Sequence, residues 1–339
     1  MPVTTVDSVI IDRDASGVTV AFGQTPVSEP APHELRVRPA YIGICGSDLE
    51  IVRGNMPETF LITYPHTMGH EWSGIVESVG ADVTAFRVGD RVLGHGHLGG
   101  NDWFGVTHNG AAQELFTVPA RMCFAVPEGV DMLTAAIIEP FACMLNGVRR
   151  IGGFDASDTV HVYGLGAIGL SAVLQAVLAG SRVVAIDPSG TRRDIATKLG
   201  AIATFDPLVD EPLIDRVLAA TGRAHADVVI EASGVASAQA SALESADQNA
   251  RVLFMGLSRP RPEPTRIGLI QERNLTVSAS TGAPLEIWEP AIRYVAQAKV
   301  DLGVMVSSVL PFSEAEDAFH RAHSAREEVK VMLAPSVDA

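Results

Sequence analysis

The sequence predicts an α/β protein with a doubly wound parallel sheet and a second, β-rich domain. Three observations lead to this prediction. Short strands between frequent glycines and prolines fill the chain to about residue 140, strands and helices alternate after about residue 157, and a glycine-rich turn spans 164–169. With 339 residues, 47% of them hydrophobic, the chain is long enough for about two domains, each with its own core.

The first part of the chain predicts a small antiparallel barrel or sandwich. β-Branched runs separated by turns occupy residues 34–40, 73–80 and 88–94. Residues 134–150 follow and predict one amphipathic helix, which includes Glu139 and Pro140.

The second part predicts a parallel sheet. Strands are expected at 159–163, 182–187, 227–231 and 250–256, and helices at 168–178 and 191–199. This alternation is typical of a sheet that helices cover on both faces. The tail adds helices at 286–298 and 313–323 and a strand at 329–333.

Composition excludes several classes of function. The net charge is −15 without any basic run, so neither nucleic acid nor an anionic membrane is an expected partner. Residues 162–181 are uncharged and long enough to span a bilayer, but their glycines favour a buried strand, turn and helix. Three scattered cysteines and an N-terminus without signal-peptide features favour a reducing, cytoplasmic setting.

The glycine turn predicts a dinucleotide site. It follows a predicted strand and opens a predicted helix, whose N-terminus supplies N–H donors for a pyrophosphate. The residues expected to contact the dinucleotide are Gly164, Gly166, Ala167, Ile168 and Gly169. Asp187 ends the next strand, where a carboxylate binds ribose hydroxyls and repels a 2′-phosphate, so NAD is favoured over NADP. Arg192 lies close enough in sequence to contact the adenosine or partly accommodate a phosphate. The alternative is a glycine turn that binds nothing, with Asp187 as a loop cap.

Four side chains predict a catalytic zinc. Cys45, His70, Glu71 and Glu139 carry the sulfur, nitrogen and oxygen donors that zinc prefers. His70 and Glu71 are adjacent, so both reach one ion only if the backbone bends between them, and Glu139 is the other candidate carboxylate. Taken singly, Cys45 and His70 are more often a small buried residue and a structural hydrogen-bonding group.

Together these segments resemble the medium-chain alcohol dehydrogenase superfamily. Residues 43–48 are similar to its first zinc motif, 65–74 to its second and 88–92 to a barrel strand, while Glu139-Pro140 resembles its polyol, threonine and glucose dehydrogenase branch. The resemblance implies a GroES-like catalytic domain over 1–148, a Rossmann domain over 149–282 and a return segment over 283–339 that completes the catalytic domain. It also implies catalysis in the cleft between the two domains.

The resemblance implies roles for individual residues. Cys45 and His70 would bind zinc, joined by Glu71, Glu139 or both in turn. Asp48 would hold the His70 tautomer, and Ser47 would hydrogen-bond the substrate hydroxyl and pass its proton outward.

Two features depart from the family pattern. Glu50 stands where many relatives place a relay histidine. A carboxylate relays protons near neutral pH only if its pKa is raised. An exposed surface charge without a catalytic role is an equally good interpretation of Glu50. Residues 93–113 hold no cysteine, so a Cys₄ structural zinc is not expected. The same segment contains His95, His97, Asp102 and His108, which predict either a second metal or, more readily, a shortened loop at the substrate mouth or an oligomer contact.

The resulting hypothesis is a zinc-dependent, NAD-linked oxidoreductase that acts on a secondary alcohol of a polar small molecule, such as a polyol, sugar or amino alcohol. A zinc-free, NADPH-dependent enone or quinone reductase on the same fold is the first alternative. A non-enzymatic dinucleotide sensor is the second. Residues 274–279 read as a strand near the edge of the sheet, where relatives pair, so a homodimer or homotetramer is expected.

Overall fold

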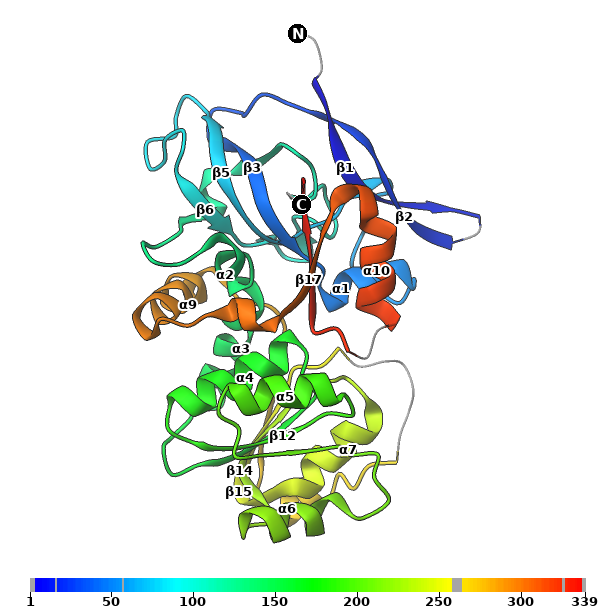
Figure 1. Ribbon diagram of the computed structural model, residues 1–339, viewed down its shortest axis with the longest axis vertical. Coiled ribbons are helices and arrows are strands. Elements are labelled where there is room, and N and C mark those ends of the chain that lie inside the picture. The colour runs from blue at the N-terminus through cyan, green and yellow to red at the C-terminus, as the bar shows by residue number, and fades with distance from the viewer. Residues whose placement is uncertain (1–3, 16, 57, 258–263, 325–326, 337–339) are drawn as a thin grey trace. The chain divides into compact units, whose positions relative to one another are not determined.

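The computed structural model describes residues 4–15, 17–56, 58–257, 264–324 and 327–336 (Figure 1). Contacts divide the chain into two compact units: the first is Met1–Glu139 with Pro284–Ala339, and the second is Pro140–Ala283. The first unit is thus built from both ends of the chain. Its boundary at Glu139 lies within helix α3 (Ile138–Arg150), before the position at residue 148 that we expected.

The first unit consists mainly of antiparallel sheets. Their strand orders are β2-β1-β4, β10-β6-β5-β3-β18-β17 with β9 beside β3, and the hairpin β7-β8. The strands are β1 (Thr4–Asp14), β2 (Gly17–Val27), β3 (Glu34–Gly43), β4 (His66–Thr67), β5 (Glu71–Val79), β6 (Arg91–Gly94), β7 (His97–Gly99), β8 (Asp102–Trp103), β9 (Phe116–Pro119), β10 (Cys123–Ala125), β17 (Val306–Pro311) and β18 (Lys330–Ala334).

Alternating apolar side chains build the core of this unit. Leu35 and Val37 on β3 point inward and are fully buried, while Arg36 between them is half-buried. Trp72 and Phe116 pack edge to face with ring centroids 4.9 Å apart. The helices are α1 (Gly46–Val52), α2 (Met132–Ala136), α9 (Leu285–Ala298) and α10 (Ala315–Ser324), with short 3₁₀ turns at Ala120–Met122, Leu302–Met305 and Phe312–Glu314.

The second unit contains a parallel sheet in the order β13-β12-β11-β14-β15-β16, flanked by helices (Figure 1). Its central strands, β11 and β14, are almost entirely buried because both of their faces are covered. The strands are β11 (Thr159–Tyr163), β12 (Arg182–Ile186), β13 (Ala203–Phe205), β14 (Ala226–Glu231), β15 (Ala246–Phe254) and β16 (Thr276–Ala279). The helices are α4 (Ala167–Leu178), α5 (Gly190–Lys198), α6 (Leu213–Thr221), α7 (Ala236–Ser245) and α8 (Leu269–Glu272).

The single helix that we predicted over residues 134–150 is two helices, α2 and α3, separated at Ile137. Pro140 explains the interruption, because it has no N–H to donate to the carbonyl four residues earlier, that of Ala136. The Asp131 side chain caps α2 by accepting from the Thr134 amide at 2.8 Å. This break places Glu139 in the first turn of α3.

None of the described helices is long and apolar enough to cross a membrane. The uncharged stretch 162–181 instead runs through the end of β11, the glycine turn and helix α4.

Candidate metal centre and cofactor site

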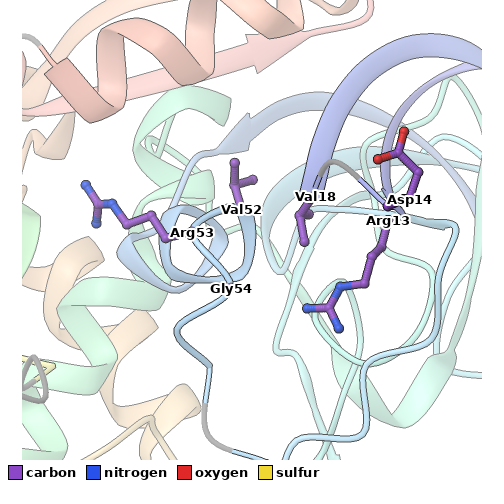
Figure 2. Close-up of a pocket in the computed structure, with 8 residues that line it drawn as sticks. Arg13, Asp14, Val18, Val52, Arg53 and Gly54 are labelled. Carbon is purple, nitrogen blue, oxygen red and sulfur yellow. The ribbon is translucent and has the colours of Figure 1, made fainter.

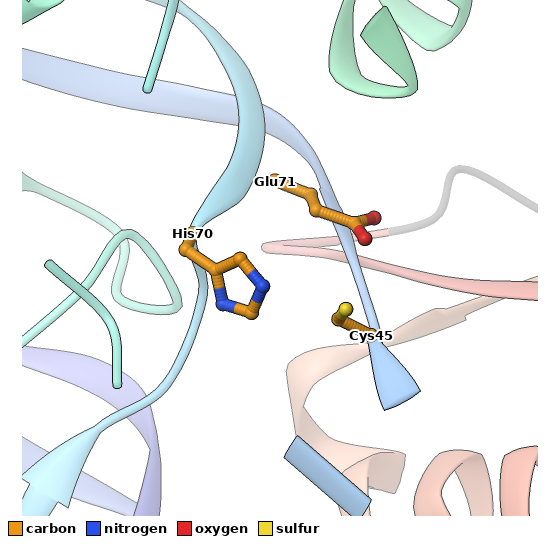
Figure 3. Close-up of side chains that lie close together, drawn as sticks. All are labelled: Cys45, His70 and Glu71. Carbon is orange, nitrogen blue, oxygen red and sulfur yellow. The ribbon is translucent and has the colours of Figure 1, made fainter. Parts of the chain in front are cut away.

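Three predicted ligands lie together in the first unit. Cys45 follows β3, His70 directly precedes β5, and Glu71 is the first residue of β5. One donor atom from each lies within 4.8 Å of the other two, and Figure 3 shows the three side chains converging. Within the part of the chain that the structure describes, this is the only such group of metal-binding side chains.

A bend in the chain lets adjacent residues reach the same point. His70 lies in a bend before the strand, whereas Glu71 is the first strand residue, so their side chains are not forced to opposite faces. Gly69 has φ 109°, a left-handed conformation that favours glycine. A Cβ on Gly69 would also lie 3.0 Å from the Ala112 backbone nitrogen. The glycine before His70 therefore permits the bend that the metal site requires.

Asp48 and Ser47 surround the His70 ring. The His70 Nδ1 lies 3.7 Å from Asp48 Oδ1, too far for a direct hydrogen bond, and its Nε2 lies 3.4 Å from Ser47 Oγ. Asp48 is fully buried, and its Oδ2 accepts from the Cys45 amide at 2.8 Å. The helix start thus fixes Asp48 and Cys45 to each other.

The acidic surroundings change how these groups hold protons. Burial opposes a charged imidazole, but the negative charges of Asp48 and Cys45 outweigh it and raise the pKa of His70 well above its ordinary value. Burial raises the pKa of Asp48 to about 6, although His70 opposes the shift. Without a metal His70 therefore retains a proton that metal binding would release.

The two other predicted carboxylates have different surroundings. Glu139 is 8% exposed and lies close enough to help raise the pKa of His70, but it is not part of the three-residue group. Glu50 lies on α1, where its carboxylate forms an ion pair with Arg53 and accepts from Asn55 Nδ2 at 2.9 Å. The proton-relay role of Glu50 stays a prediction.

Sequence reasoning missed Lys330. Its side chain is buried, forms an ion pair with Glu71 and donates from Nζ to the Ile44 carbonyl at 3.0 Å. A lysine inside the apolar run 329–333 was the available signal, because an ammonium is rarely buried in a strand without a charged partner.

The residues present fit a zinc ion. They offer one thiolate, one imidazole and a carboxylate, which is a zinc donor set. Two buried atoms here, His70 Nδ1 and Oδ1 of the neighbouring Asp48, have no hydrogen-bond partner. Buried polar atoms left in this way in one small region suit a site that is completed by an ion.

The histidine-rich segment does not form a second metal site in the described residues. The His97 ring packs against Trp103 with centroids 4.8 Å apart, and His108 Nε2 lies 3.2 Å from Asp102 Oδ1. His95 is buried against Trp288 instead. The three imidazoles are therefore engaged separately.

The predicted dinucleotide turn lies in the second unit, between β11 and α4. Gly164 has φ 85°, and a Cβ on Gly169 would lie 1.7 Å from the Gly164 carbonyl oxygen, so the turn closes only with glycine at both positions. Gly166 is the N-cap of α4, and a Cβ there would meet no protein atom within 4 Å. The helix N-terminus thus faces open space at Gly166, as a pyrophosphate site requires.

Asp187 and the two neighbouring arginines lie beside this turn. Asp187 is 4% exposed, and its carboxylate accepts from the backbone amides of Leu165 at 2.7 Å and Ser189 at 2.8 Å. Arg192 Nη1 lies 3.8 Å from Asp187 Oδ2, and Arg193 Nη1 donates to the Asp187 carbonyl at 2.6 Å. Each carboxylate oxygen has a second lone pair, so Asp187 retains capacity for ribose hydroxyls.

A hollow on the first unit lies apart from these residues. Figure 2 shows it between β1, β2 and α1, with Arg13 and Arg53 among its lining residues. Arg13 lies over the Tyr64 ring at 4.7 Å, and Arg53 forms an ion pair with Glu50. Both cations are engaged, and none of the predicted site residues lines this hollow.

Comparison with known proteins agrees with this geometry. An alcohol dehydrogenase GroES-like domain matches residues 31–128, and a zinc-binding dehydrogenase domain matches residues 167–297. An L-threonine 3-dehydrogenase of Bacillus subtilis is 31% identical over 90% of this chain and 93% of its own length. The chain belongs to the zinc-dependent medium-chain alcohol dehydrogenase family.

Other relatives of this dehydrogenase point the same way. A 2-dehydro-3-deoxy-L-galactonate 5-dehydrogenase of Pseudoalteromonas atlantica is 30% identical over 86% of this chain and 88% of its own length. A solved structure described as a zinc-binding dehydrogenase of Sinorhizobium meliloti, bound to NADP, is 29% identical, with a TM-score of 0.88 over 98% of this chain and 100% of that one. The predicted family, the GroES-like and Rossmann fold and an NAD(P)-linked alcohol dehydrogenase activity are confirmed.

Proposed function

We propose that this dehydrogenase oxidises a secondary alcohol on a polar small molecule, or reduces the corresponding ketone, with one catalytic zinc and NAD. The observation that carries the proposal is the convergence of Cys45, His70 and Glu71 within 4.8 Å. When bound, zinc supplies a Lewis acid that lowers the pKa of the substrate hydroxyl.

We assign Glu71 as the carboxylate ligand of the zinc and keep Glu139 as the second candidate. We choose Glu71 because it belongs to the three-residue group. Glu139 stays the alternative ligand because it lies near enough to raise the pKa of His70. A carboxylate in place of a second thiolate makes an oxygen-rich site.

The chain's own residues orient the substrate and move its proton. Ser47 is half-buried next to His70, and its hydroxyl both donates and accepts, so it takes the hydroxyl proton of the substrate and passes it outward. Asp48 is held by the Cys45 amide and faces His70 Nδ1, which keeps the opposite ring nitrogen available. Hydride transfer itself belongs to the nicotinamide.

The relatives support a polar secondary alcohol. Similar proteins are named L-threonine 3-dehydrogenase, D-xylulose reductase and sorbitol dehydrogenase. The compounds in these three names each have a hydroxyl or keto carbon flanked by further polar groups. We infer the same class here and leave the individual compound open.

NAD is the proposed cofactor because Asp187 places a buried carboxylate at the end of β12, where it would repel a 2′-phosphate. Arg192 partly neutralises that charge, so NADP is the second choice. We also propose a homodimer or homotetramer paired through β16, the edge strand of the described sheet, on which Thr276 and Val277 are exposed. We propose a reducing, cytoplasmic setting for the protein, because a chain of 339 residues with three scattered cysteines offers no disulfide framework.

A turnover panel tests the proposal. Polyols, aldoses and amino alcohols are each supplied with NAD and with NADP, before and after zinc removal by a chelator. We expect NAD-dependent oxidation of a polar secondary alcohol that is lost with zinc and returns with added zinc. Reduction of an enone or quinone by NADPH that survives chelation would instead support the zinc-free reductase, and cofactor binding without any turnover would support a sensor.

A further inference from the structure

Lys330 is a fully enclosed cation beside a proposed metal ligand. Its residue is 3% exposed, its Nζ pairs with Glu71, and the same Nζ donates to the Ile44 carbonyl at 3.0 Å. Desolvating an ammonium group is costly, and the cost is offset only by a close and well-placed negative partner. Glu71 provides that partner.

Three strands build the space for this pair. Gly43 on β3 lies opposite Glu71 on β5 and opposite Met332 on β18, two residues from Lys330. A Cβ on Gly43 would lie 2.1 Å from Glu71 Oε2 and 2.8 Å from the Lys330 Cε. The ion pair therefore depends on the missing side chain at Gly43, and it is a built feature of the sheet.

The Glu71 carboxylate lies next to both the proposed metal site and the Lys330 ammonium group. One of its oxygens lies within 4.8 Å of donor atoms of Cys45 and His70, while Lys330 holds Oε2. A fixed cation on a carboxylate reduces the negative charge that this carboxylate offers to a second cation. Lys330 and a metal ion thus compete for Glu71.

We propose that Lys330 is a positioning residue that holds Glu71 and sets how firmly this carboxylate binds the metal. The inference rests on the proposed zinc site. It predicts an unusual direction: removing a buried partner of a ligand strengthens metal binding. A lysine that merely supported the fold, or merely oriented Glu71 as a ligand, would weaken metal binding when removed.

The test compares Lys330→Met with Lys330→Arg. Methionine keeps the length and loses the charge, while arginine keeps the charge. Zinc affinity is measured by competition with a chromophoric chelator, and Co²⁺ placed in the same site reports the ligand set through its visible absorption. We expect Lys330→Met to bind zinc about 10- to 100-fold more tightly, with a changed Co²⁺ spectrum, and Lys330→Arg to stay near the parent.

The Glu71→Gln background provides the control. Adding Lys330→Met to Glu71→Gln should change zinc affinity little, because the carboxylate through which Lys330 acts is gone. This double variant removes both charges together and so leaves no unpaired buried charge. Unchanged or weaker zinc binding in Lys330→Met, or an equal change in the Glu71→Gln background, would overturn the inference and leave the zinc site standing. A parent protein without zinc would overturn both.

Discussion

Asp187 accepts a hydrogen bond from the Leu165 amide at 2.7 Å and so ties the end of β12 to the glycine turn. The carboxylate is buried, and both of its oxygens already accept from backbone amides. It therefore shapes the turn and at the same time presents negative charge where the adenosine ribose is expected.

Asp187→Asn tests this double role, because asparagine keeps the size and removes the charge. We expect kcat/KM with NAD to fall about tenfold, the effect of losing one charged hydrogen bond, while kcat/KM with NADP rises. Asp206→Asn is the control, since Asp206 lies 3.7 Å from Arg193 on the surface of the same unit. An unchanged ratio of NAD to NADP in Asp187→Asn would contradict the assignment.

Gly166→Ala separates cofactor binding from folding. The free protein has room for the added methyl group, but that group would occupy the space into which the first-turn amides of α4 point. We expect the unfolding temperature to stay close to the parent value and NADH affinity, followed by fluorescence, to fall about tenfold or more. Gly169→Ala should instead unfold the domain, because its Cβ would lie 1.7 Å from the Gly164 carbonyl oxygen. Undiminished NADH binding by Gly166→Ala would place the cofactor elsewhere.

Ser47→Ala tests the proton path. The hydroxyl lies 3.4 Å from His70 Nε2, and its loss removes a proton carrier without removing a metal donor. We expect kcat to fall about 10²-fold while zinc content stays at the parent level, and Ser47→Thr to recover most of the activity. Zinc loss in Ser47→Ala would show a structural role, and full activity would remove Ser47 from the mechanism.

His161 should make the protein sensitive to acid. It lies on β11, is 1% exposed, and neither ring nitrogen has a hydrogen-bond partner. Burial lowers the pKa of His161 to about 4, from 6.5 in an unfolded chain. The neutral ring is therefore favoured in the fold, so its contribution to stability is complete above pH 6.5 and is lost as the pH falls toward 4, by about 3 kcal/mol at most.

His161→Leu removes that titration. The free energy of unfolding, measured by urea titration at pH 7 and at pH 4.5, should fall less in this variant than in the parent. His33→Leu, at an exposed position, should behave like the parent. An equal fall in His161→Leu and the parent would show that other groups cause the acid sensitivity.

The sequence predicted the fold where local patterns are strong. The strand at 159–163 is found over those same residues, because β-branched and aromatic residues directly before a glycine turn identify a strand. Helix α7 was missed, since its alanine- and serine-rich sequence gives little contrast between faces. The break between α2 and α3 was missed although Pro140 signalled it.

The candidate site was also predictable only in part. Donor types and their order pointed to Cys45, His70 and Glu71, which the structure brings together. The partnership of Glu71 with Lys330 was out of reach, because it depends on which strand lies beside β3. Such pairing between the two ends of a chain has no local signal in the sequence.

The most direct test of the zinc site is the zinc content per chain, by elemental analysis of the parent, of Cys45→Ser and of Cys123→Ser. Cys123 is buried on β10 and outside the metal group, so its replacement controls for the loss of a thiol. We predict about one zinc in the parent and in Cys123→Ser, and close to none in Cys45→Ser. A parent made with zinc supplied that contains none, or a Cys45→Ser variant that keeps its zinc, would contradict the site.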